Sequence, residues 1–181
     1  EYLSTITVTE GTGTPASIED LIREGESDEL EFKATMRWDL VQGSVNKAME
    51  EVIVKAVAAF ANSQGGTLVI GVDDDGQVVG LSHDYQSLGD ADRDKFERHV
   101  RQLLSQQLGA AFVSSKVMIR FHELGDAEVC QIDVEMGREP IVLASRDKGG
   151  QLVEKFYVRS GNASHALPMS EMNAYLKERF G

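Results

Sequence analysis

The sequence contains one cysteine, Cys130, and no apolar run that approaches the roughly 18 residues of a membrane-spanning helix. A single cysteine excludes a disulfide framework within the chain and a zinc site built from several cysteines. No secretory signal sequence is recognisable either. We therefore expect no zinc site, no membrane association and a reducing, cytoplasmic location. The sequence begins with Glu1 rather than Met, which indicates a fragment of a longer protein.

Positive charge is also scarce, because 18 Lys and Arg face 30 Asp and Glu, for a net charge of −12. Phosphate neutralisation by Lys and Arg usually supplies much of the affinity of a protein for nucleic acid. Such a composition therefore argues against nucleic-acid binding unless cations gather in one local patch. The candidates for such a patch are Lys33, Arg98, Arg101, Lys155 and Arg159.

The motifs of the common nucleotide-binding folds are missing as well. Neither GxxxxGK[ST] nor GxGxxG occurs. The glycine-rich run 63–67 follows a predicted helix and precedes a predicted strand, whereas a phosphate-binding loop needs the opposite order. The four histidines are scattered without metal-ligand spacing, and no Ser-His-Asp arrangement can be argued from the sequence.

The most informative stretch is residues 60–81, FANSQGGTLVIGVDDDGQVVGL. Its pattern predicts a helix end, a tight turn, a buried strand over 67–72, an acidic turn and a return strand over 77–81. The preceding helix is predicted over 45–61, because its apolar residues recur with helical spacing. That stripe consists of Met49, Val52, Ile53, Ala56 and Phe60.

The rest of the chain predicts an α+β domain, a mixed β-sheet with packed helices. Residues 1–16 resemble a flexible arm with one strand over 4–9, and residues 17–181 a single domain. The expected helices begin at Ser17, at Asp90 or Asp92, and at Ser170. The second of these should bury Phe96, Val100, Leu103, Leu104 and Leu108. The expected strands cover 26–33, 116–121, 128–134, 140–144 and 152–158, with polar loops over 36–43, 82–89 and 159–164.

Three carboxylates stand at the ends of strands that we expect to be neighbours: Glu26, Glu31 and Asp73. Clustered carboxylates repel one another, so they favour a site where Mg²⁺ or Mn²⁺ neutralises them. Such an ion could activate water beside a phosphodiester, with Lys33 offsetting developing charge. Acidic strand faces are common, however, and Asp74 and Asp75 fit simple turn positions.

The ordered set of motifs resembles the Schlafen-type AlbA-like domain. The resemblance rests on Glu26-Ser27, 30–33 (LEFK), 59–63 (AFANS) with 65–68 (GGTL), 70–74 (IGVDD), Gly80-Leu81 and 156–164 (FYVRSGNAS). It implies an α+β fold, DNA or RNA binding as in prokaryotic transcriptional regulators, and in some members metal-dependent endoribonuclease action on RNA such as tRNA. The acidic triad of those nucleases falls on Glu26, Glu31 and Asp73, so the resemblance places a Mg²⁺ or Mn²⁺ site there.

Three functions therefore remain open from the sequence. The domain is a nucleic-acid-binding module with structural acidic residues, a Mg²⁺- or Mn²⁺-dependent ribonuclease, or a non-catalytic oligomerisation or protein-interaction domain. The last of these, a homo-oligomer for example, explains the acidity most simply.

Overall fold

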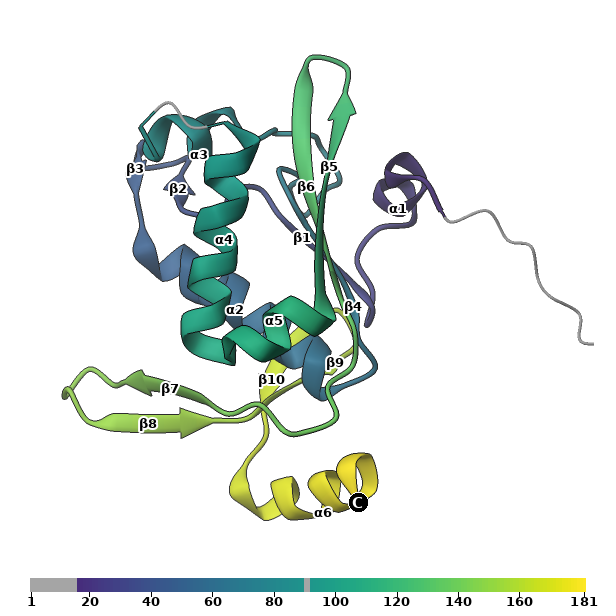
Figure 1. Ribbon diagram of the computed structural model, residues 1–181, viewed down its shortest axis with the longest axis vertical. Helices are drawn as coiled ribbons and strands as arrows, with labels where there is room; N and C mark the ends of the chain where they lie inside the picture. The colour runs from purple at the N-terminus through teal and green to yellow at the C-terminus, as the bar shows by residue number, and fades with distance from the viewer. Residues whose placement is uncertain (1–15, 90–91) are drawn as a thin grey trace, which may run out of the picture.

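The computed structural model describes residues 16–89 and 92–181, so the predicted arm and its strand over 4–9 lie outside the described residues. Its main sheet has four strands in the order β1 (Leu30–Lys33), β4 (Gly66–Ile70), β6 (Ala127–Val134) and β5 (Val117–Leu124) (Figure 1). β1 runs parallel to β4, and the other pairs are antiparallel. The predicted mixed sheet of an α+β domain is thus confirmed.

One face of this sheet packs against α2 (Lys47–Asn62) and α4 (Arg93–Leu108), which α5 (Ala110–Lys116) follows. The side chains of a strand alternate between its two faces, so Leu68 and Ile70 of β4 join this core. Phe60 of α2 and Phe96 of α4 are fully buried in the same cluster. The predicted buried face of α4 is confirmed for Phe96, Val100, Leu104 and Leu108, whereas Leu103 is partly buried. The Asp92 side chain caps the helix by accepting the Lys95 N–H.

The opposite face holds a smaller cluster beneath α1 (Ile18–Glu24). Leu30, Phe32 and Val69 from the strands meet Ile18 there. Ser17 and Asp20 form a capping box that fixes the start of α1. Both faces of β4 are consequently covered, which explains why it is a continuous apolar run, whereas β1 alternates and places Glu31 and Lys33 on the face opposite Leu30 and Phe32.

Smaller elements surround this body. Three two-stranded hairpins are formed by β2 (Trp38–Asp39) with β3 (Ser44–Val45), β7 (Leu143–Arg146) with β8 (Leu152–Lys155), and β9 (Tyr157–Ser160) with β10 (Ala163–Ala166). The remaining helices are α3 (Ser82–Ser87) and α6 (Met169–Phe180). Across the described residues, no helix combines the length and apolarity required to traverse a bilayer.

Several local predictions from the sequence were wrong. The return strand over 77–81 is reduced to a single bridge between Val72 and Val78. The polar run 82–89 contains α3, which is fixed because the buried Asp84 carboxylate accepts the N–H groups of residues 36–38. The loop over 159–164 is instead the β9–β10 hairpin. The strand over 26–33 begins only at Leu30.

Candidate functional site

The predicted proximity of the first strand and the strand after the glycine turn is confirmed. β1 and β4 are parallel neighbours, with Glu31 opposite Leu68 and Lys33 opposite Ile70. The side chain of Glu31 is only 10% exposed. Its Oε1 lies 2.8 Å from the Lys33 ammonium, and its Oε2 pairs with the Arg159 guanidinium. Glu31 therefore already has two cationic partners.

Arg159 of β9 is the centre of this cluster, and its side chain is 2% exposed. Besides Glu31, its guanidinium donates to the carbonyl oxygens of Ser27 at 2.7 Å and Asp28 at 3.2 Å. It lies over the Phe60 ring, 4.7 Å from the ring centroid. The cation thus ties the C-terminal hairpin to the entrance of β1, and its exposed fraction leaves it little access to a phosphate group.

The other two predicted metal ligands bind local backbone. One carboxylate oxygen of Glu26 accepts the Phe32 N–H at 2.8 Å. Oδ1 of Asp73 accepts the N–H groups of Asp75 and Gln77 and so caps the acidic turn. Within residues 16–89 and 92–181, no three His, Cys, Asp or Glu side chains form a group suited to a metal ion. The Mg²⁺ or Mn²⁺ site remains a prediction.

The five predicted nucleic-acid-binding cations do not form one patch. Lys33 and Arg159 are the ion-pair partners of Glu31, and we name these three residues the acidic cluster. Lys33 also donates to the Phe32 carbonyl oxygen. Arg98 is exposed on α4, whereas Arg101 of the same helix pairs with Glu97 at 2.7 Å. Lys155 is exposed at the end of β8, which belongs to a different part of the fold.

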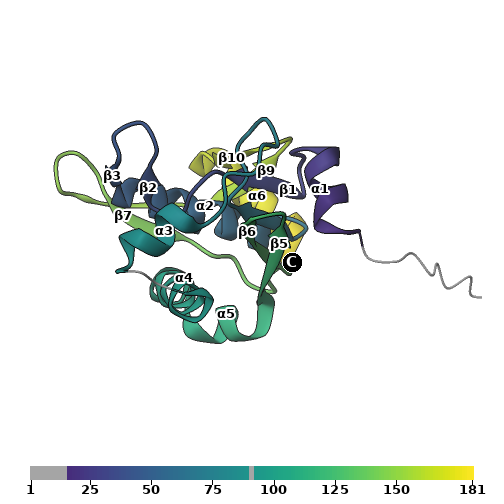
Figure 2. The same cartoon turned by 90° about the horizontal axis from the view of Figure 1, so that it is seen from above.

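That part is the β7–β8 hairpin, residues 143–155, which we name the basic arm. It projects from the body of the molecule on the side away from α1 (Figures 1 and 2). Arg146, Lys148 and Lys155 are exposed on it, and no ion pair within the described parts of the chain involves them. Of its two carboxylates, Asp147 caps the turn by accepting the N–H groups of Gly149 and Gln151.

A hollow of about 400 Å³ lies where the basic arm joins α2 and α4. Arg146 and Lys55 line it together with Glu51. Lys55 is held over the Tyr157 ring, 5.5 Å from the ring centroid, a geometry in which the ring face attracts the ammonium group. The base of the arm therefore offers two cations and an aromatic ring on one concave surface.

Comparison with protein families matches residues 26–168 to the Schlafen, AlbA_2 family. This chain belongs to that family. A solved structure with the same overall fold is the DIP2311 protein from Corynebacterium diphtheriae, with a TM-score of 0.52 and 19% sequence identity. The match covers 84% of this chain and 28% of that protein, and at this identity the similarity concerns the fold alone.

Residues 60–63 (FANS) of this AlbA_2 domain position the base of the arm, a role that was not predicted from the sequence. The buried side chain of Asn62 donates to the carbonyl oxygens of Ile141 and Tyr157 and accepts the Ile141 N–H, each at 2.8–2.9 Å. Ser63 Oγ accepts the Arg159 N–H at 2.9 Å. The Asn-Ser pair stood out in the sequence, but its partners lie some 79 to 96 residues away.

The adjacent glycines are required by close contacts. A Cβ at Gly65 would lie 2.6 Å from the Val134 carbonyl oxygen, and one at Gly66 would lie 2.3 Å from the Phe60 ring. Both residues also have positive φ angles, which favour glycine. The glycine turn of this domain therefore serves packing between α2 and β4, with no phosphate-binding geometry needed to explain it.

Proposed function

We propose that this AlbA_2 domain is a nucleic-acid-binding module whose basic arm contacts phosphate groups, and that Glu31 and Arg159 hold the fold together. The observation that carries the proposal is the set of exposed cations on the arm without an acidic partner in the described structure: Arg146, Lys148 and Lys155. Family membership supports the same general function.

The contrast in charge pairing supports this division of roles. A cation that is buried against a carboxylate, as Arg159 is, has its charge compensated inside the protein. An exposed cation without such a partner keeps its charge available and can release counterions from a nucleic-acid backbone. The net charge of −12 then bears less on binding, because the arm carries three exposed cations against two carboxylates, Asp147 and Glu154, and projects away from the body.

Titration of labelled duplex DNA, single-stranded DNA and tRNA tests the proposal, with affinity measured at several salt concentrations. We expect wild-type affinity to fall steeply with salt and the triple variant Arg146→Gln, Lys148→Gln, Lys155→Gln to lose about three units of the slope of log K against log salt. Arg23→Gln is the matched control, because Arg23 is an exposed cation of α1. Equal salt slopes for wild type and the triple variant would refute the proposal.

The family resemblance predicts two more specific roles, a place within a transcriptional regulator and the cleavage of RNA. Cleavage of tRNA with and without Mn²⁺ tests the second role, and Asp73→Asn is the appropriate variant. An asparagine Oδ1 can still accept the two turn N–H groups that Asp73 accepts, so folding should be preserved while the negative charge is removed. Mn²⁺-dependent cleavage that this variant lacks would support the ribonuclease.

An oligomerisation or protein-interaction domain is the alternative to nucleic-acid binding. Sedimentation at several protein concentrations would detect self-association. Self-association combined with the absence of salt-sensitive binding to any of the three nucleic acids would favour this alternative.

A further inference from the structure

The hollow at the base of the basic arm continues along the connecting segment 137–146 towards α6. It shares Gln107 with a second hollow of about 470 Å³ between α5 and that segment. The second hollow in turn shares Lys116, Gly137 and Arg138 with a third, of about 400 Å³, beside α6. The three hollows therefore lie in succession from the arm to α6, and we name them together the track.

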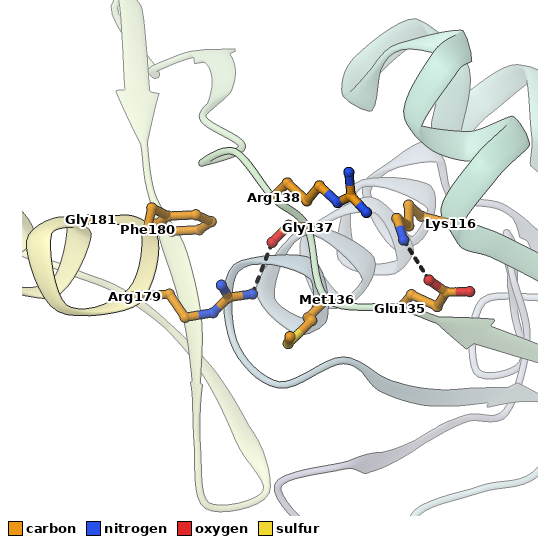
Figure 3. A pocket seen from close by; sticks show the side chains of 8 residues that line it. All are labelled: Lys116, Glu135, Met136, Gly137, Arg138, Arg179, Phe180 and Gly181. Carbon is orange, nitrogen blue, oxygen red and sulfur yellow. Dashed lines mark hydrogen bonds and ion pairs between the residues drawn. The ribbon is translucent and has the colours of Figure 1, made fainter.

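Cations line each part of this track. Figure 3 shows Lys116 and Arg138 on one side of Gly137, with the Lys116 ammonium directed to Glu135, and Arg179 on the other side. Lys116 pairs with Glu135 at 2.5 Å, and Arg179 donates to the Gly137 carbonyl oxygen at 3.0 Å, whereas the exposed Arg138 forms no ion pair within the described residues. In a chain where acids outnumber Lys and Arg, five cations and three carboxylates line the track: Lys55, Lys116, Arg138, Arg146, Arg179, Glu51, Glu135 and Glu139.

Each hollow also contains one partly exposed aromatic ring. These rings are Tyr157 at the arm, Phe112 in the middle and Phe180 beside α6. Figure 3 shows the Phe180 ring at the edge of the third hollow. Alternation of cations with aromatic rings is the arrangement by which proteins bind single-stranded nucleic acid, because the cations follow the phosphates and the rings stack on the bases.

We propose that this track binds a single strand of nucleic acid, which enters at the basic arm and stacks bases on Tyr157, Phe112 and Phe180. The inference rests on the proposed nucleic-acid binding and specifies its substrate class. Unpaired bases are needed, because the bases of a duplex are already stacked and paired and cannot stack on protein rings that line a hollow. An acidic polypeptide would satisfy the cations and leave the rings unused.

Fluorescence anisotropy with the wild-type protein tests the proposal. The probes are oligothymidylates of 3, 6, 12 and 18 nucleotides, oligouridylates of the same lengths and a 12-base-pair duplex. We expect affinity to rise with length beyond three nucleotides and the single strands to bind more tightly than the duplex. Phe180→Leu and Phe112→Leu keep an apolar side chain, and each should weaken single-strand binding by at least about fivefold, the equivalent of about 1 kcal/mol per lost stack. Circular dichroism establishes that each variant is folded.

Arg138→Gln keeps the test decisive if Phe112→Leu fails to fold, because Arg138 is exposed. This variant should lower the affinity for the longer single strands and leave the duplex unaffected. One result would refute binding along the track and leave the proposed function intact. In that result single strand and duplex bind with equal affinity through the arm, and neither Phe180→Leu nor Arg138→Gln changes the affinity. Displacement of the oligonucleotide by polyglutamate of equal length at equal concentration would likewise refute binding along the track. Absence of binding to every nucleic acid would reject both.

Discussion

The acidic cluster around Glu31 and the basic arm contain charged residues in opposite circumstances. At Glu31 the carboxylate is paired twice, and its partner Arg159 is 2% exposed and also donates to two carbonyl oxygens. On the arm, Arg146, Lys148 and Lys155 are exposed and have no ion-pair partner among the described residues. The sign of a side chain's charge alone therefore does not identify a ligand-binding site. Whether the fold has already compensated a charge separates a structural residue from one that is available to a ligand.

The largest effect is expected from the core residue that supports the acidic cluster. Phe60 is fully buried and lies beneath the Arg159 guanidinium. Phe60→Ala should lower the free energy of unfolding by about 3–5 kcal/mol, because it removes buried surface and leaves a cavity. Urea denaturation measures this change. A loss below about 1 kcal/mol would show that the cluster does not depend on this packing.

The next effect is expected from Glu31→Gln. From the sequence alone, this substitution should leave folding intact, because glutamine preserves the shape of glutamate. The structure changes that expectation, because the variant leaves the buried Arg159 without its carboxylate partner. Removing one partner of a buried ion pair costs about 3–5 kcal/mol. Because glutamine can still accept a hydrogen bond from Arg159, we expect the free energy of unfolding to fall by about 3 kcal/mol, measured by urea denaturation.

The matched change on the arm is Lys148→Gln, which also removes one charge. We expect its free energy of unfolding to stay within about 0.5 kcal/mol of wild type, since the residue is exposed and away from packed features. The double variant Glu31→Leu, Arg159→Met should recover much of the stability lost in Glu31→Gln, because it replaces the pair with apolar groups. Equal losses for Glu31→Gln and Lys148→Gln would remove the distinction between the two regions.

A pH-dependent effect is expected at Asp84, a buried carboxylate outside both regions. Burial raises the pKa of Asp84 above its usual value, although the N–H groups of Met36, Arg37 and Trp38 oppose that shift. The folded state then binds the proton more tightly than the unfolded state, so the Asp84 contribution is most favourable at low pH and decreases as pH rises through the folded pKa. The stability of wild type minus that of Asp84→Asn should fall as the pH rises from the ordinary Asp pKa of 3.8 through the raised folded pKa. A rising difference would contradict the direction of the shift.

The elements predicted correctly are those whose secondary structure follows from a local sequence pattern. α2, α4, β4 and the β5–β6 hairpin follow from long apolar periodicities, and Asp92 was recognisable as an N-cap. α3 was missed because it is short, polar and fixed by the contact of Asp84 with residues 36–38. The end of β9, the turn and the start of β10 fall in the predicted loop over 159–164, because this part of the sequence is polar and contains glycine.

The candidate site was less predictable, because its contacts join residues that are far apart in the sequence. The shared face of Glu31 and Lys33 and the proximity of their strand to the strand over 67–72 were expected from the sequence, whereas the parallel direction of the pairing with β4 was not predicted. The pairing of Glu31 with Arg159 spans 128 residues and carries no periodic signal. The track was also invisible in the sequence, because its cations come from separate elements and only tertiary packing places them along one segment.

The long connection between Glu31 and Arg159 also bears on how the domain emerges during translation. At about 5–20 residues per second, a ribosome needs roughly 6–25 s to add the 128 residues that separate the two partners. Throughout that interval the growing polypeptide carries a carboxylate whose final environment does not yet exist, and β1 lacks the hairpin that closes over its entrance. A bound chaperone or slow elongation in this window would therefore act on the parallel pairing of β1 with β4 more than on the β5–β6 hairpin, whose two strands leave the ribosome one directly after the other.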